Sequence, residues 1–328
     1  MSYPKIELHV HLEGTVRPRT LLEIARRNDY DLPADTEEGL AALYDFRDFT
    51  HFIEVWVLTT NALRTAEDFR EVVVEYAAEA ASHGAVYVEG IFSPAERVRR
   101  GVDWDEIFTG YCDGSQEARE LHGVEVRLTP DIIRGFPLED AEATVRHAAR
   151  YRDRGVLGVG LGGLEADYPP EPYEPAFDLA RELGLASVPH AGEAAGPPSV
   201  RGALETLRAD RIRHGVRAVE DDGLVREIAD RRVVLDVCPI SNLRTGAVHT
   251  LDEHPLPKLV AAGALCSIST DDPAMFGTDL SQDYEAAASL GVDPETVYAA
   301  GLEGALCDDA TKARLRETGQ SFDWDTLR

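Results

Sequence analysis

The chain alternates short runs of β-branched and apolar residues with longer segments whose apolar residues recur every three or four positions. The first pattern is typical of buried strands and the second of amphipathic helices. Strands separated by helices pair in parallel through crossover connections, and eight such units close a (β/α)8 barrel. The sequence therefore predicts an α/β fold, a (β/α)8 TIM barrel. The eight predicted strands are residues 5–12, 85–92, 125–133, 157–163, 185–190, 211–215, 233–239 and 265–272.

Several of the predicted helices have a recognisable end. The segments 66–84, 139–155, 175–184 and 256–263 each finish with a glycine. Glycine readily takes the left-handed conformation that closes a helix. We therefore expect these helices to stop at or just before their glycines.

The regular alternation is interrupted between the first and second predicted strands, where about 70 residues intervene. Their pattern predicts a helical insertion between strands 1 and 2 that caps the mouth of the barrel. Residues 292–328 are expected to form terminal helices on its outside. Since no repeat, low-complexity tract or linker is visible, residues 1–328 are predicted to form a single domain.

The charge of the chain narrows the choice of partners. Sixty acidic residues against 33 basic ones give a formal net charge of −27. This field repels a phosphate backbone, so we expect no nucleic-acid partner. The sequence shows neither a secretory signal nor an apolar run of the roughly 20 residues that span a bilayer, so a cytoplasmic protein without membrane contact is expected. The oligomeric state stays open.

Ionisable residues stand at the ends of several predicted strands, where buried apolar residues are the norm. Active sites of (β/α)8 barrels lie at the carboxyl ends of the strands, so these side chains are expected to converge. Burying so many ionisable groups costs several kcal/mol unless they are paired or bound to a metal. The residues are His9, His11, His190, Glu193, His214, Asp271 and Asp272.

Histidine and carboxylate ligands together suit Zn²⁺, which binds neutral imidazole nitrogen and carboxylate oxygen. Three histidines and one aspartate leave a coordination position for a water, whose pKa a bound zinc lowers to about 7. Barrel hydrolases with two metals commonly carry a modified lysine at the end of strand four, but here that segment ends in Gly162 and Gly163. A single metal is therefore favoured, although His/Asp sites also accept iron or cobalt.

The motifs around these residues resemble those of the adenosine deaminase family, which belongs to the metal-dependent amidohydrolases. The resemblance covers nearly the whole chain in the family's order, and it implies hydrolytic removal of a 6-amino group from an adenine ring. The matching segments are HVHLEG (9–14), HAGE (190–193), RHG (213–215), CPISN (238–242) and STDDP (269–273).

The resemblance also implies a role for each residue of the predicted site. The ligands of one Zn²⁺ per subunit would be His9, His11, His190 and Asp271. Glu193 would protonate the purine N1, and His214 would orient the attacking hydroxide and assist proton transfer. Asp272 would contact the attacking hydroxyl and N7. Gly163 would present its backbone N–H to N3, although a tight strand-end turn explains that glycine equally well.

Three departures from the family pattern concern the substrate. Glu13 stands where adenosine-specific members carry an aspartate that contacts the ribose 5′-hydroxyl, so Glu13 is predicted to bind the substrate differently. Leu164 removes a carboxylate near the sugar, and Ile91 replaces a common arginine. The resemblance thus implies 6-aminodeoxyfutalosine, an adenine nucleoside with a bulky 5′ extension used in a menaquinone pathway, or adenosine. Adenine is the alternative, because adenine deaminases also carry a glutamate after HxHL.

An aromatic stripe in the insertion could contact such a 5′ extension, or could simply pack the helix. The stripe contains Phe46, Phe49, Phe52 or Ile53, and Trp56.

Two other functions are compatible with parts of the pattern. One is a barrel hydrolase that cleaves an ester or amide, but Glu193 and Asp272 argue against it because those bonds need no acid aimed at a ring nitrogen. The other is a metal-stabilised binding protein without catalysis. The complete acid–base set argues against that function.

Overall fold

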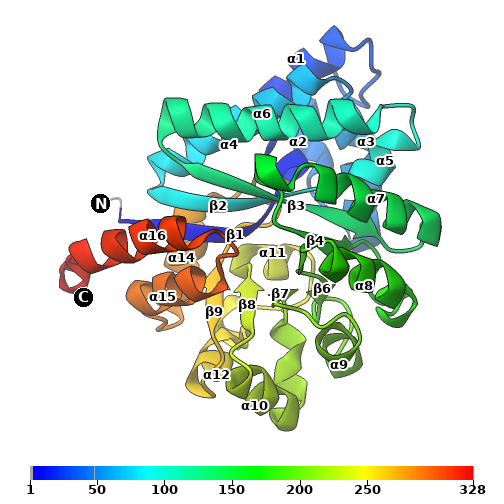
Figure 1. The fold of residues 1–328 in the computed structure, drawn as a ribbon. Coiled ribbons are helices and arrows are strands. Elements are labelled where there is room, and N and C mark those ends of the chain that lie inside the picture. The colour runs from blue at the N-terminus through cyan, green and yellow to red at the C-terminus, as the bar shows by residue number, and fades with distance from the viewer. Residues whose placement is uncertain (1–2, 48, 328) are drawn as a thin grey trace.

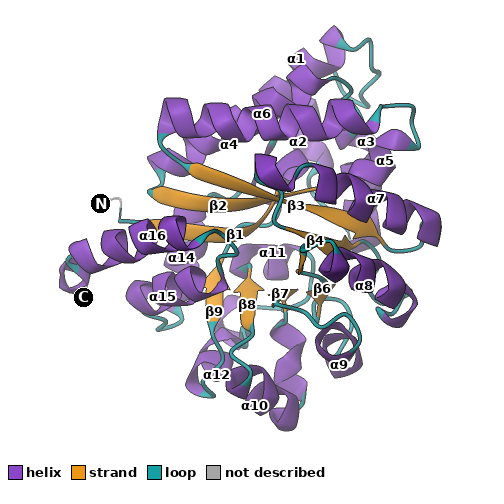
Figure 2. Ribbon diagram, in the orientation of Figure 1, coloured by secondary structure: helices purple, strands orange, loops and turns teal. Residues whose placement is uncertain are grey.

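Parallel strands form the centre of the molecule, and helices surround them (Figure 1). The computed structural model describes residues 3–47 and 49–327. Figure 2 shows the strands curving around a common axis with the helices outside. The strands are β1 (Lys5–His11), β2 (Ala85–Phe92), β3 (Glu125–Ile133), β4 (Gly158–Gly162), β5 (Ala186–Ser187), β6 (His190–Ala191), β7 (Arg211–His214), β8 (Val234–Val237) and β9 (Cys266–Ile268).

Each of the eight predicted strand segments contains a strand, and one of them is interrupted. Segment 185–190 is split into β5 and β6 at Pro189, which has no N–H to donate to a neighbouring strand. Hydrogen bonds continue across the break, because the amide of Val188 donates to the carbonyl of Val159 at 3.0 Å. The strands pair in parallel in the orders β1-β2-β3-β4-β5 and β6-β7-β8-β9.

The last strand meets the first and closes the barrel. The amide of His11 donates to the carbonyl of Asp271 at 2.7 Å, and the amide of Asp271 donates to the carbonyl of His9 at 3.1 Å. The protein is therefore a (β/α)8 barrel, and this junction carries three of the predicted site residues.

Three predicted helices, α4 (Ala66–Ser82), α8 (Glu174–Glu182) and α12 (Leu256–Ala261), end two residues before their glycines as expected. The fourth, α7 (Leu138–Arg150), ends earlier, and Gly155 closes the 3-10 helix Arg152–Arg154 instead. Gly84, Gly155, Gly184 and Gly263 all have positive φ angles, between 74° and 102°. The helices are α1 (Pro18–Arg27), α2 (Glu37–Leu43), α3 (Phe49–Thr60), α4 (Ala66–Ser82), α5 (Pro94–Val98), α6 (Trp104–His122), α7 (Leu138–Arg150), α8 (Glu174–Glu182), α9 (Pro197–Glu205), α10 (Asp222–Asp230), α11 (Pro239–Arg244), α12 (Leu256–Ala261), α13 (Pro273–Phe276), α14 (Leu280–Ser289), α15 (Pro294–Gly304) and α16 (Asp309–Ser321). Short 3-10 helices cover Leu12–Thr15, Arg152–Arg154, Glu171–Tyr173, Val216–Glu220, Leu251–Glu253 and Trp324–Leu327.

The insertion between β1 and β2 consists of two parts. α1, α2 and α3 form the predicted cap, whereas α4 is an outer helix of the barrel and runs beside α6 (Figure 1). The two outer helices approach closely because α6 presents Gly110 and Gly114, where any Cβ would come within 2.8 Å of α4. The cap helix α3 rests on α13, with the rings of Phe52 and Phe276 5.0 Å apart.

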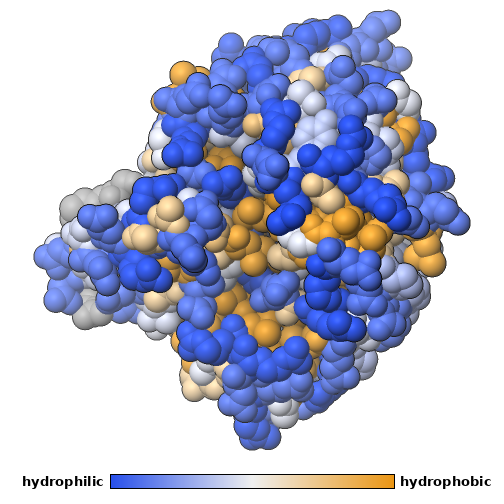
Figure 3. All heavy atoms as spheres, viewed as in Figure 1, coloured by the Kyte–Doolittle hydropathy of each residue, from blue (hydrophilic) through white to orange (hydrophobic). Residues whose placement is uncertain are grey.

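The C-terminal helices pack on the outside, as predicted. α15 lies against β1, where Gly301 is so close to Ile6 that a Cβ would stand 3.0 Å from that side chain. Hydrophilic side chains cover most of the face seen in Figure 3, and apolar ones gather in the hollows between helices. Within residues 3–47 and 49–327, none of the helices combines the length and apolar character needed to span a bilayer.

Charged residues fill the barrel interior below the predicted site. The guanidinium of Arg211 donates to Asp236 at 2.5 Å and to Glu89 at 2.8 Å. Its remaining hydrogen bonds go to the carbonyls of Gly304 at 2.8 Å and Leu8 at 3.0 Å. This buried group, which we call the Arg211 cluster, links β1, β2, β7 and β8 to α15.

Candidate active site

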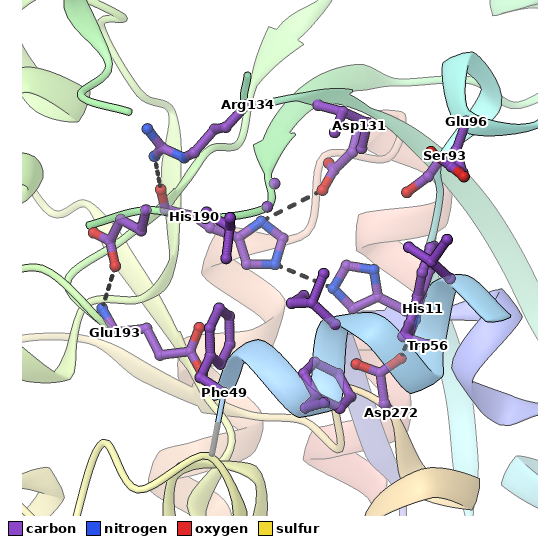
Figure 4. Close-up of a pocket in the computed structure, with 18 of the residues that line it drawn as sticks. His11, Phe49, Trp56, Ser93, Glu96, Asp131, Arg134, His190, Glu193 and Asp272 are labelled. Carbon is purple, nitrogen blue, oxygen red and sulfur yellow. Dashed lines mark hydrogen bonds and ion pairs between the residues drawn. The ribbon is translucent and has the colours of Figure 1, made fainter. Parts of the chain in front are cut away.

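A cavity of about 220 Å³ opens at the carboxyl ends of the strands. Figure 4 shows His11 and His190 facing one another inside it, with Phe49 and Trp56 of the cap on one side. Because these residues come from distant parts of the sequence, closure of the barrel is what brings them together.

The predicted metal ligands form a compact group. Asp271 Oδ1 lies 3.1 Å from His9 Nε2 and 3.3 Å from His11 Nε2. His190 Nε2 lies 3.1 Å from the same atom of His9 and 3.2 Å from that of His11. An ion with four ligands at about 2.0 Å in a tetrahedron keeps those ligands about 3.3 Å apart. The spacing of this donor set therefore fits one tetrahedral metal ion.

The protonation of two of the three histidines agrees with this interpretation. For His11, burial is outweighed by the neighbouring carboxylates of Asp272 and Asp271, which raise the pKa to about 9, so a bound metal would displace a proton from this ring. Burial lowers the pKa of His9 to about 3 and holds the pKa of His190 well below its usual value, so both rings are neutral at neutral pH. His190 Nδ1 lies 3.2 Å from the carbonyl of Leu161 and 3.4 Å from Asp131 Oδ2. A proton on Nδ1 satisfies these acceptors and leaves the Nε2 lone pair available for a metal.

The carboxylate of Asp271 is held in one orientation. The hydroxyl of Ser241 donates to its Oδ2 at 2.6 Å, which leaves Oδ1 toward the histidines. Asp271 and His214 both have positive φ angles, 70° and 64°, which non-glycine residues rarely adopt. Backbone strain of this kind persists where the surrounding structure imposes it and is common at functional sites.

Glu193 lies next to the candidate metal ligands and has an unusual environment. Burial, together with the neighbouring carboxylates of Asp271 and Glu165, raises its pKa well above the usual value. Its Oε2 is 3.4 Å from His214 Nε2, and among the described residues its buried Oε1 has no hydrogen-bond partner. A buried carboxylic acid of this kind keeps its proton at neutral pH and can donate it to a ligand.

Glu165 has a structural role in the site that the sequence did not predict. Its carboxylate accepts hydrogen bonds from consecutive backbone amides of the loop that carries Glu193. The only sequence signal was the run of small residues after HAGE, whose amides need an acceptor. The donors are the amides of Gly192 (2.6 Å), Glu193 (3.1 Å), Ala194 (2.7 Å) and Ala195 (3.0 Å) and the hydroxyl of Ser199 (2.5 Å).

Asp272 is clamped between the cap and the first strand. The indole N–H of Trp56 donates to Asp272 Oδ1 at 2.9 Å, and both side chains are buried. A Cβ on Gly14 would stand 1.8 Å from the same oxygen, so only glycine fits there. This contact gives a physical reason for the glycine of HVHLEG, and it identifies Trp56 as a partner of Asp272.

The predicted substrate-binding residues differ in position. Gly163, with φ of 99°, and Asp272 line the cavity. Glu13 is not among the described residues that line it, and its contact with the substrate stays a prediction. Its Oε1 accepts from the amide of Ser93 at 2.8 Å and lies 3.6 Å from Arg97, because the chain turns into a 3-10 helix after His11.

The aromatic stripe of the insertion forms one wall of the cavity. Phe46 does not face the cavity but packs on Phe52, with ring centroids 5.2 Å apart. The lining residues of α3 are Phe49, Phe52, Ile53, Trp56 and Val57. Apolar side chains from the end of β3 and from the loops after β3 and β4 also line it, namely Ile133, Phe136 and Leu164.

Comparison with known proteins identifies the family. The model of the adenosine deaminase family matches residues 4–320. The chain belongs to the adenosine deaminase family. This adenosine deaminase family member is a hydrolytic deaminase, as the motifs predicted, and the barrel is the family's fold.

Three proteins similar to this chain are an aminodeoxyfutalosine deaminase, an adenine deaminase and a zinc-bound amidohydrolase. An aminodeoxyfutalosine deaminase of Acidothermus cellulolyticus is 56% identical over 99% of this chain and 93% of its own length. The solved adenine deaminase from Arthrobacter aurescens superposes with a TM-score of 0.92 at 30% identity, over 97% of this chain and 98% of its own. An amidohydrolase from Burkholderia ambifaria, solved with bound Zn, has a TM-score of 0.89 at 28% identity, over 99% of this chain and 91% of its own.

Proposed function

We propose that this family member hydrolyses the 6-amino group of an adenine nucleoside to the 6-oxo product and ammonia, with 6-aminodeoxyfutalosine as the preferred substrate and adenosine as the second. The observation that carries the reaction is the pairing of a neutral buried acid, Glu193, with a four-residue donor set beside it in one cavity. Release of ammonia from zinc-loaded protein and a 6-aminopurine tests it.

The donor set fits one zinc ion per chain. Neutral imidazole nitrogens and a carboxylate oxygen are typical zinc ligands, and the spacing fits a tetrahedron. The zinc-bound relative from Burkholderia ambifaria supports this metal. The ion would be held by His9, His11, His190 and Asp271, and when bound it would supply an activated water as nucleophile.

Four further residues would act on the purine and the attacking water. Glu193 would donate its proton to N1, because protonation there offsets the loss of ring conjugation when C6 is attacked. His214, 3.7 Å from Asp271, would hold the attacking oxygen by a hydrogen bond. Asp272, fixed by Trp56, would contact N7, and the N–H of Gly163 would meet N3.

The preference for a 5′-extended nucleoside rests on the cap. Five side chains of α3 give the cavity an apolar wall that an apolar 5′ extension could contact. The relative from Acidothermus cellulolyticus, an aminodeoxyfutalosine deaminase, supports the same substrate. Adenine is the alternative, favoured by the likeness to the adenine deaminase from Arthrobacter aurescens. We also propose that residues 1–328 form a single catalytic domain.

Side-by-side kcat/KM values for 6-aminodeoxyfutalosine, adenosine and adenine on zinc-loaded protein test the substrate preference. We expect Ile53→Asn to lower kcat/KM for the 5′-extended substrate about tenfold, because it puts an amide in the apolar wall, and to leave adenosine nearly unchanged. Leu58→Asn is the matched control on the exposed face of the same helix, where Leu58 is 42% exposed. Equal losses on both nucleosides contradict the role of the wall.

A further inference from the structure

A chain of buried hydrogen bonds leads from the first amide of α12 to His214. The amide of Leu256 donates to His254 Nδ1 at 3.1 Å, and His254 Nε2 lies 3.2 Å from Asn242 Oδ1. Asn242 Nδ2 in turn lies 3.2 Å from His214 Nδ1. The three side chains are buried, with 3% exposure for His254, none for Asn242 and 1% for His214.

The direction of this chain follows from its first member. A backbone amide can only donate, so His254 Nδ1 is an acceptor. Burial lowers the pKa of His254 to about 4, and its neutral ring therefore carries the single proton on Nε2. That proton requires an oxygen at Asn242, so the Asn242 amide group faces His214. If the oxygen and nitrogen of the Asn242 amide were exchanged, its N–H group would face the N–H at His254 Nε2.

We propose that Asn242 and His254 fix His214 as the tautomer that carries its proton on Nε2, so that His214 is a hydrogen-bond donor toward the reacting oxygen. His214 Nδ1 is occupied as an acceptor of the Asn242 amide. Its Nε2 faces two acceptors, Glu193 Oε2 at 3.4 Å and Asp271 Oδ2 at 3.7 Å. Both neighbours of Nε2 are thus carboxyl oxygens, which can accept from a proton on that nitrogen.

The proposal gives the CPISN segment a purpose beyond packing. Ser241 donates to Asp271 at 2.6 Å, and the next residue, Asn242, donates to His214. α11 therefore aligns one candidate metal ligand and one candidate catalytic residue together. Asn242 and His254 are positioning residues, since they act through His214. The part played by His214 in deamination rests on the proposed function, whereas its tautomer does not.

Nitrogen NMR of the full chain tests the tautomer directly. The protein is labelled with ¹⁵N-histidine and loaded with zinc, and the His214 ring is assigned among the ten histidines by the signals missing in His214→Gln. We expect a protonated Nε2 and an unprotonated Nδ1. The opposite pattern overturns the proposal.

Two sets of variants test the positioning residues. Asn242→Asp offers acceptors to both rings, so we expect the proton of His214 to move to Nδ1 and kcat to fall about 100-fold. KM should change by less than about twofold, because substrate contacts remain. His254→Gln keeps a donor toward Asn242 and should retain the wild-type tautomer, whereas His254→Phe should not. An unchanged tautomer in both Asn242→Asp and His254→Phe overturns the proposal.

The tautomer of His214 and the deaminase activity are contradicted by different outcomes. A protein with the proton on Nε2 that deaminates none of the 6-aminopurines contradicts the proposed function alone. A protein that deaminates them with the proton on Nδ1 contradicts only the role assigned to Asn242 and His254. Should Asn242→Asp not fold, the wild-type spectrum and the two His254 variants still decide.

Discussion

Two groups of buried ionisable residues occupy the same barrel, and they differ in how their charges are satisfied. In the Arg211 cluster the guanidinium binds Asp236 and Glu89, and further donors complete both carboxylates. Tyr87 donates to Glu89 at 2.8 Å and Ser267 donates to Asp236 at 2.8 Å. The opposite charges and hydrogen bonds offset the cost of burial, which is the condition for a stable buried ion pair.

In the candidate active site the burial is similar but the pairing is incomplete. The Nε2 atoms of His9, His11 and His190 lie against one another, and the first two share a single acceptor, Asp271 Oδ1. The described residues also provide no hydrogen-bond partner for Glu193 Oε1 or His11 Nδ1. The comparison teaches that burial of charge alone does not indicate function. Groups arranged around a common point and left without protein partners indicate a ligand.

The largest expected effect comes from removing a candidate metal ligand. Asp271→Ala should abolish both metal binding and ammonia release, because it deletes the only anionic member of the donor set. Metal content by mass spectrometry and deaminase activity are the measurements. A variant that binds zinc with wild-type stoichiometry and turns over normally excludes Asp271 as a ligand.

The second effect concerns the proton donor. Glu193→Gln should keep its zinc but lower kcat about 1000-fold, because an amide cannot supply the proton that N1 needs. Steady-state kinetics with metal analysis checks this. The raised pKa of Glu193 also has a pH signature, since the acid form is lost as pH rises. The alkaline decline of kcat/KM in the wild type should be absent from the residual activity of the variant.

The third effect is a loss of stability without a loss of catalytic activity. Arg211→Met leaves the carboxylates of Glu89 and Asp236 buried without their cation, so the free energy of unfolding should drop by about 3–5 kcal/mol. Denaturant unfolding measures this change. Arg146→Met, which breaks only an exposed pair with Glu142, is the control and should cost under about 1 kcal/mol. If Arg211→Met instead lowers kcat at unchanged stability, the two groups are not separable.

The smallest effect tests the loop that carries the acid. Glu165→Gln replaces a carboxylate that accepts five hydrogen bonds with an amide that places N–H groups against some of those donors. We expect kcat to fall about tenfold with zinc retained, because Glu193 loses its position rather than its proton. Glu174→Gln on the exposed start of α8 is the matched control. A change in KM alone speaks against a role in positioning Glu193.

The sequence by itself determined the barrel and most of its element boundaries. Strand and helix periods differ, and a glycine just past the last turn can close a helix, so these features are local and visible in the chain. The motif residues could also be placed at strand ends, because the architecture assigns those ends to one face. The periodicity did not reveal the break at Pro189 or that α4 belongs to the barrel rather than to the cap.

Only the tertiary structure decided which side chains meet. Glu13 stands in a matching motif, yet its side chain binds the amide of Ser93 behind the cavity wall. The partners of Glu165, Trp56 and His254 were not predicted. Glu165 binds the amide of Glu193, 28 residues away, and Trp56 binds Asp272, 216 residues away. His254 reaches His214 only through Asn242. The direction in which a side chain points, and the distant group with which it pairs, depend on packing across the closed barrel. No local period in the sequence encodes that packing.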